Sequence, residues 1–180
     1  TATLTDSKIY GDTYTFPAPV EGTNYTVDGL VDASVHGDVF LQDTLASIGL
    51  SGAPVFSSSG AVATATEAGS PYLVNIAQGS LSNTAGYAFG TFNAGGGLTV
   101  NPRAITVTAN GGTSTYGDSP VDPGLSATNL ASFDDVSDLT GLSNSFGING
   151  TTIAGTYTLT VAGTLTNGNY LVTATSSGTW

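Results

Sequence analysis

The stretch AITVTANGGTSTYGD, residues 104–118, decides how the fold is interpreted. Its first six residues alternate Ile and Val with Thr and Ala, the period-2 pattern of a half-buried β-strand. Gly111 and Gly112 then predict a turn, and the tripeptide Tyr116-Gly117-Asp118 ends the stretch. The same tripeptide occurs as Tyr10-Gly11-Asp12, 106 positions earlier. Two occurrences indicate that the chain contains internal copies of one structural unit.

A second stretch, AGTYTLTVAGTLTNGNYLVT at residues 154–173, supports this interpretation. Tyr, Leu and Val alternate with Thr over residues 156–161, which predicts a strand. The Asn-Gly turn at residues 166–169 predicts an antiparallel hairpin whose returning strand starts at Tyr170. Residues 68–100 contain a matching series, and the two Ala-Gly pairs lie 86 positions apart. The first copy therefore carries an insertion between its tripeptide and its Ala-Gly pair.

One stretch in each copy does not alternate. Residues 132–141 predict a short helical turn, capped by Ser132, with Asp135 at the capping-box spacing and Gly141 at its end. Residues 36–49 take this place in the first copy. A β-solenoid is disfavoured because its repeats would recur about every 20–30 residues.

We therefore predict a mainly β fold of two tandem small β modules, residues 1–101 and 102–180, joined by a short linker containing Pro102. The sequence leaves two architectures open for each module. One is a sandwich, and the other is a curved, β-grasp-like sheet that holds one short helix.

Charge and composition exclude several classes of function. The chain contains thirteen acidic residues and only two basic ones, Lys8 and Arg103, which gives a net charge of −11. Such a chain cannot neutralise a phosphate backbone, so we expect no nucleic-acid binding, and no apolar run approaches the ~20 residues that cross a bilayer. The absence of cysteine excludes disulfides and thiolate sites. Few lysines and abundant Thr, Ser and Gly favour a bacterial extracellular location, and the lack of Met suggests a segment of a longer protein.

Catalytic and metal-binding patterns are sparse. His36 is the one histidine, no Gly-rich phosphate loop opens a helix, and no pair of acids is placed for glycan hydrolysis. We therefore expect no enzymatic activity and no organic cofactor. Calcium is the exception, since it prefers several oxygen ligands. The candidate calcium ligands are Asp134, Asp135 and Asp138, and further acids recur at Asp118, Asp122, Asp28, Asp32, Asp38 and Asp43.

The tripeptides have a structural interpretation. We expect Tyr10 and Tyr116 to anchor the start of each module in its core. Glycine at Gly11 and Gly117 would permit the turn, and Asp12 and Asp118 would fix it by accepting hydrogen bonds from nearby backbone N–H groups.

These motifs carry a resemblance to a known family. The stretch ITVTANGGTSTYGD, the stretch GLVDASVHGD at residues 29–38 and the series at residues 154–173 resemble the MBG-type and related YDG repeats of giant bacterial adhesins, including filamentous-haemagglutinin-like proteins. The first copy departs from the pattern by its insertion and by AGSPY in place of AGTY. The resemblance implies a non-enzymatic stalk or adhesive repeat in a long extracellular filament at the cell surface.

The resemblance also implies the partners. These are neighbouring repeats of the same chain, copies of the chain itself, or surface glycans and host or biofilm matrix. An alternative function is a carbohydrate-binding module that uses Trp180 or exposed tyrosines such as Tyr14 and Tyr25 as stacking platforms.

Overall fold

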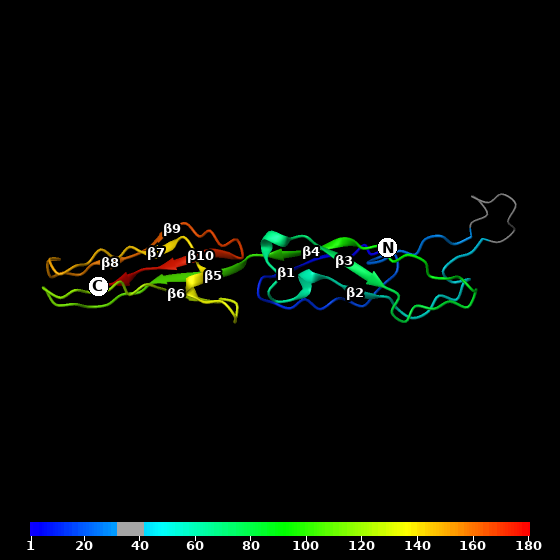
Figure 1. Ribbon diagram of the computed structural model, residues 1–180, viewed down its shortest axis with the longest axis horizontal. Helices are drawn as coiled ribbons and strands as arrows, with labels where there is room; N and C mark the ends of the chain where they lie inside the picture. Colours follow the sequence, from blue (N-terminus) through cyan, green and yellow to red (C-terminus); the bar gives the residue numbers. More distant parts are fainter. Residues whose placement is uncertain (32–41) are drawn as a thin grey trace. The chain divides into compact units, whose positions relative to one another are not determined.

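The computed structural model describes residues 1–31 and 42–180 (Figure 1). The predicted mainly β fold is confirmed, because the helical segments of the described residues are single 3-10 turns. These turns are η1 (Ser59–Ala61), η2 (Glu67–Gly69) and η3 (Val136–Asp138). No helix in these ranges is long and apolar enough to cross a membrane.

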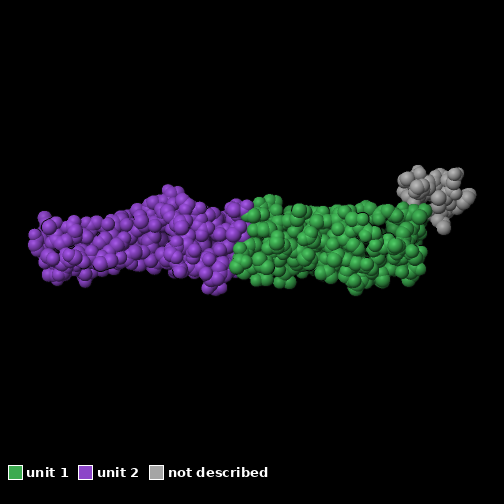
Figure 2. Space-filling view, in the orientation of Figure 1, with its two compact units in different colours: residues 1–8, 13–65, 69–100 green, residues 9–12, 66–68, 101–180 purple. Residues whose placement is uncertain are grey.

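The described chain divides into two compact units, coloured separately in Figure 2. Unit 1 consists of Thr1–Lys8, Thr13–Ala65 and Gly69–Val100. Unit 2 consists of Ile9–Asp12, Thr66–Ala68 and Asn101–Trp180. Unit 2 therefore includes two short segments that lie far upstream of its main part in the sequence.

A four-stranded sheet forms the centre of unit 1. Its order is β1 (Thr5–Ile9), β4 (Gly95–Asn101), β3 (Tyr72–Ala77) and β2 (Val55–Ser57). On β3, Val74 and Ile76 are buried while their neighbours Leu73 and Asn75 are exposed, as the period of a strand requires. The side chains of Val74 and Ile76 pack in a core with Ala2, Leu4, Tyr25, Phe56 and Leu98.

A three-stranded sheet forms the core of unit 2, in the order β10 (Tyr170–Ser176), β5 (Arg103–Ala109), β6 (Leu125–Thr128). The predicted strand at residues 104–109 is confirmed as β5, and its Ile105, Val107 and Ala109 are buried. Strand β6 pairs with β5 antiparallel. Strand β10 runs parallel to β5, and Figure 1 shows their arrows pointing the same way.

The strand predicted at residues 156–161 is interrupted. It divides into β8 (Thr158–Leu159), which pairs with β11 (Gly178–Thr179), and β9 (Val161–Gly163), which pairs with β7 (Leu142–Asn144). Thr160 lies between the two pieces, and its backbone N–H donates to the Ser145 hydroxyl at 2.8 Å. The single-strand prediction is therefore wrong, because the chain changes its pairing partner at Thr160.

The predicted Asn-Gly hairpin is also wrong. The strand from Tyr170 exists as β10, but it pairs with β5 and not with β9, whose partner is β7. Asn167 explains the difference: its amide donates to the Asp138 carbonyl at 3.0 Å, and its Oδ1 accepts from the Asn169 backbone at 3.1 Å. These bonds hold the turn against η3 and direct the chain to the edge of β5.

The short helical turn forms three residues later than predicted. Its N-cap is Asp135 and not Ser132, and Asp135 and Asp138 form the capping box. Residues 131–134 make a separate turn, with the Asp134 N–H donating to the Ala131 carbonyl at 3.0 Å, so Ser132 lies inside that turn. In the first copy, residues 42–44 are irregular and residues 45–49 form a turn, with no helix between them, while residues 36–41 lie outside the described residues.

Candidate functional site

The two tripeptides form the same kind of turn. The Asp12 N–H donates to the Ile9 carbonyl at 3.1 Å, and the Asp118 N–H donates to the Thr115 carbonyl at 3.0 Å. Gly11 has φ of +87° and Gly117 has φ of +95°. A left-handed residue in the third position is the mark of a type II turn, and glycine adopts it without a steric penalty.

The tyrosines of the two turns differ in burial. Tyr10 is 5% exposed, and its ring lies edge-on to Phe133 at 5.9 Å and to Tyr170 at 5.4 Å between centroids. Tyr116 is 69% exposed. Tyr10 is thus buried, but its ring packs against Phe133 and Tyr170 of the predicted second module and not in the module that it was expected to start. The prediction that each tyrosine anchors its own module is therefore wrong for Tyr10, and it is also wrong for Tyr116, which is largely exposed.

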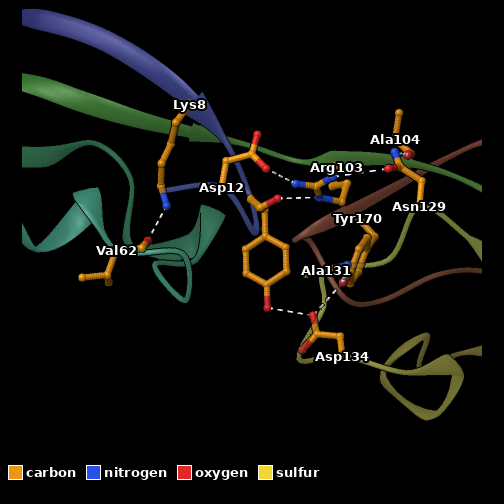
Figure 3. A network of polar contacts seen from close by, with 10 residues as sticks. Lys8, Asp12, Val62, Arg103, Ala104, Asn129, Ala131, Asp134 and Tyr170 are labelled. Atoms are coloured by element: carbon orange, nitrogen blue, oxygen red, sulfur yellow. Dashed lines mark hydrogen bonds and ion pairs between the residues drawn. The ribbon is translucent and has the colours of Figure 1, made fainter. Parts of the chain in front are cut away.

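Asp134 joins the two buried tyrosines of unit 2. Its Oδ2 accepts a hydrogen bond from the Tyr10 hydroxyl at 2.9 Å and from the Tyr170 hydroxyl at 2.6 Å. The Tyr170 oxygen also accepts from the Ala131 N–H at 3.0 Å (Figure 3). Burial, then the bond to Asp134, raises the pKa of Tyr10 to about 12, and the same two causes raise the pKa of Tyr170.

Arg103 connects the turn to the start of β5. Its Nε donates to the Tyr10 carbonyl at 2.7 Å, its Nη1 donates to Asn129 Oδ1 at 3.3 Å, and its Nη2 forms an ion pair with Asp12 (Figure 3). Asn129 in turn donates to the Ala104 carbonyl at 2.7 Å. The planar guanidinium thus satisfies a backbone carbonyl and a carboxylate together, which a lysine cannot match geometrically.

The two aspartates of the tripeptides are used differently. Asp118 Oδ2 accepts from the Thr115 N–H at 2.8 Å, the bond that we expected to fix the turn. Asp12 forms an ion pair with Arg103. The sequence offered one signal for this pair, because Arg103 is the chain's one arginine and stands among many acids.

The candidate calcium ligands have other partners in the structure. Asp134 accepts the two tyrosine hydroxyls, while Asp135 and Asp138 cap η3. Bonds from Ser137, side chain first and backbone second, lower the pKa of Asp135. In the part of the chain that the structure describes, no three metal-ligating side chains converge. Calcium binding remains a prediction, and His36, Asp32 and Asp38 lie outside the described residues.

The candidate sugar-stacking rings are packed against their own units. Tyr25 is 6% exposed, so its prediction as an exposed platform is wrong, because its ring is part of the unit 1 core. The half-buried Tyr14 donates from its hydroxyl to Asp6 at 2.6 Å. Trp180 lies 4.9 Å from Phe146 between ring centroids, and its indole N–H donates to the Ser114 hydroxyl at 3.0 Å.

Comparisons of the chain with protein-family models, with curated proteins and with solved structures give no match.

A glycine pair tests the difference between the two turns. A Cβ on Gly11 would lie 2.8 Å from the Ala131 Cβ and 3.1 Å from the Arg103 Nε, whereas a Cβ on Gly117 meets nothing within 4 Å. Both positions have positive φ, so each alanine variant loses about 1 kcal/mol of stability from backbone strain. We expect Gly11→Ala to cost about 2 kcal/mol more than Gly117→Ala, because it also overpacks the site. Urea unfolding measures both, and equal losses would contradict the tight packing around Gly11.

Alkaline pH tests the tyrosine pair. The unfolded chain releases a tyrosine proton near pH ~10, but folded Tyr10 holds its proton until about pH 12. Stability is therefore unchanged up to pH ~10 and falls as the pH rises from there to 12, by at most about 1.4 kcal/mol per pH unit for each such tyrosine. Urea unfolding at several pH values measures the slope. Tyr10→Phe should reduce this slope, and an unchanged slope would exclude Tyr10 as a source.

Proposed function

We propose that this chain is a structural or adhesive repeat segment of a long extracellular bacterial adhesin or filament, in which it acts as a stalk or self-associating module. The observation that carries the proposal is the recurrence of one turn, with the same backbone bond and the same left-handed glycine, at residues 9–12 and 115–118. A recurring motif fits a repeat protein, because the length of such a protein increases with the number of repeats while each repeat is stabilised locally.

A second pair of equivalent contacts supports the proposal. In unit 1, Tyr72 on β3 pairs with Leu98 on β4. In unit 2, Tyr157 and Trp180 exchange two backbone hydrogen bonds of 2.8 Å. Tyr72 and Tyr157 are the first tyrosines after the two Ala-Gly pairs and lie 85 positions apart, and each takes part in an antiparallel ladder.

The sheet of unit 2 suits mechanical load. Strand β5 begins two residues into the main segment of unit 2, and its parallel partner β10 ends at Ser176, near the last residue. Tension applied at the two ends of this segment pulls parallel strands in opposite directions along their axes. The ladder bonds are then loaded in shear and must break together, whereas an antiparallel hairpin pulled at its open end breaks them one by one.

Force spectroscopy tests the stalk function. When the 180-residue chain is pulled between its ends, we expect separate unfolding events for the two units, with unit 2 resisting as a single cooperative step. The matched control pulls unit 2 between residue 101 and residue 128, which opens β5 and β6 from one end of their antiparallel ladder. Equal unfolding forces in the two geometries would contradict a load-bearing role.

Cell location tests the extracellular assignment separately. Antibodies raised against the 180-residue chain should label intact producing cells or the culture medium. Labelling that requires permeabilised cells would overturn the adhesin proposal whatever the mechanical result.

Carbohydrate binding is the second candidate, and one feature of unit 1 favours it. A hollow of about 370 Å³ is lined by the aromatic residues Tyr87, Phe89 and Phe92. Aromatic faces stack on the apolar faces of sugar rings while hydroxyl and amide groups orient them. A glycan array tests this function, and binding that survives Phe92→Ala would place the sugar elsewhere.

A further inference from the structure

Two short segments of unit 2 come from far upstream, and both have sequence equivalents within unit 2 itself. Ile9–Asp12 corresponds to residues 115–118 at a spacing of 106, and both contain Tyr-Gly-Asp. Thr66–Ala68 corresponds to residues 152–154 at a spacing of 86, and both begin with Thr and end with Ala. These are the two spacings at which the internal copies align. Each upstream segment that completes unit 2 therefore has a sequence equivalent further along the chain, at residues 115–118 and 152–154.

The upstream segments complete unit 2 through defined contacts. Tyr10 places its ring against Tyr170 and its hydroxyl on Asp134, and its carbonyl accepts from Arg103. The Glu67 N–H donates to the Asn169 Oδ1 at 2.9 Å. A β unit of this kind thus has an acceptor site for a Tyr-Gly-Asp turn. The site consists of an arginine at the start of the central strand, an aspartate and a tyrosine.

Nothing in the described part of the chain covers the second set of segments in this way. Tyr116 is 69% exposed and Ile153 is 77% exposed. The two segments lie together, because the Gly117 N–H donates to the Gly150 carbonyl at 3.0 Å, and both line one open hollow of about 160 Å³. Tyr116 is therefore left in water at a position whose equivalent, Tyr10, is buried in unit 2. Ile153 is exposed at the position where the partly buried Glu67 contacts Asn169 through its backbone N–H.

We propose that residues 115–118 and 152–154 form a docking surface for a further β unit of the unit 2 kind. In the partner unit, the residues equivalent to Tyr170 and Asp134 would contact Tyr116. The partner's equivalent of Arg103 would pair with Asp118, and its equivalent of Asn169 would accept a hydrogen bond from the Ile153 N–H. The partner is not an unmodified second copy of this chain, because in that copy Tyr10 already occupies the acceptor. This inference rests on the proposed function and names the partner of its repeat units.

A fusion protein tests the docking. Leu98 and Trp180 hold equivalent pairing positions, so a second copy of residues 99–180 is attached directly after Trp180. Tyr116 of the added copy is changed to Leu, so that the peptide around the original Tyr116 differs in mass from that of the added copy both before and after oxidation. Hydroxyl-radical labelling of that tyrosine should fall at least roughly tenfold in the fusion relative to the 180-residue chain, because opening then requires unfolding of the added copy.

Two variants of the fusion give the second readout. Tyr116→Ala in the original unit should lower the calorimetric midpoint of the added copy by roughly 10 °C or more, as the loss of a buried ring does. The matched control is Val121→Ala, which removes another exposed apolar side chain (80%) of the same unit and should leave the midpoint unchanged.

A Tyr116 that is labelled equally in both proteins overturns the docking proposal, and so does an added copy that fails to fold next to an intact Tyr116. Neither result affects the force and location measurements, so failure of the docking surface can be told from failure of the stalk function.

Discussion

Replacing Tyr10 with Ala should lower the free energy of unfolding of unit 2 by about 3–5 kcal/mol, as for other buried aromatic residues. The variant removes a ring that is 5% exposed, the edge contacts to Phe133 and Tyr170, and one of the two hydroxyls on Asp134. Urea unfolding of the 180-residue chain, followed by a probe in unit 2 such as Trp180 fluorescence, measures the loss.

Tyr116→Ala is the matched control for this variant. It changes the same residue of the same tripeptide, but at a position that is 69% exposed, so we expect a loss within about 0.5 kcal/mol. Tyr10→Phe separates the ring from the hydroxyl and should cost about 1 kcal/mol, the usual value of one hydrogen bond. Similar losses for Tyr10→Ala and Tyr116→Ala would show that the two turns share one environment.

Replacing Arg103 with Ala should destabilise unit 2 by about 2–3 kcal/mol, because the buried Tyr10 carbonyl then loses its donor from a charged group. The side chain of Arg103 is only 16% exposed, so solvent compensates little of this loss. Arg103→Lys keeps the charge but lacks the planar fork, and we expect it to recover only part of the stability. The same urea unfolding experiment measures both variants.

The ion pair contributes less than the carbonyl bond in this account. Asp12 is 54% exposed, and exposed pairs are worth at most about 1 kcal/mol. Asp12→Asn should therefore cost much less than Arg103→Ala. If the two variants were equally destabilising, the ion pair and not the carbonyl would be the important contact of Arg103.

Local patterns in the sequence predicted the elements that depend on neighbouring residues. The alternation of Ile105 and Val107 with threonines is sufficient for β5, because burial of one face follows directly from the period of a strand. Pairing was not predictable in the same way. The Asn-Gly turn suggested a hairpin, but Asn167 is held by the Asp138 carbonyl, 29 residues earlier, and no local pattern contains that contact.

The candidate site shows the same limit more sharply. Tyr10 and Tyr116 lie in identical tripeptides, and both form the turn that Gly and Asp favour. Whether the ring is buried depends on Asp134, which is 124 residues from Tyr10 and which the sequence had suggested as a calcium ligand. A clustered acid next to an aromatic-rich β unit is therefore also a candidate acceptor for a tyrosine hydroxyl.

The account depends most on one turn motif having two environments, and residue-specific hydroxyl-radical labelling of the native 180-residue chain tests this most directly. Peptide mass spectrometry should find Tyr116 labelled rapidly and Tyr10 protected until unit 2 unfolds in urea. Equal labelling of Tyr10 and Tyr116 under native conditions would contradict the account.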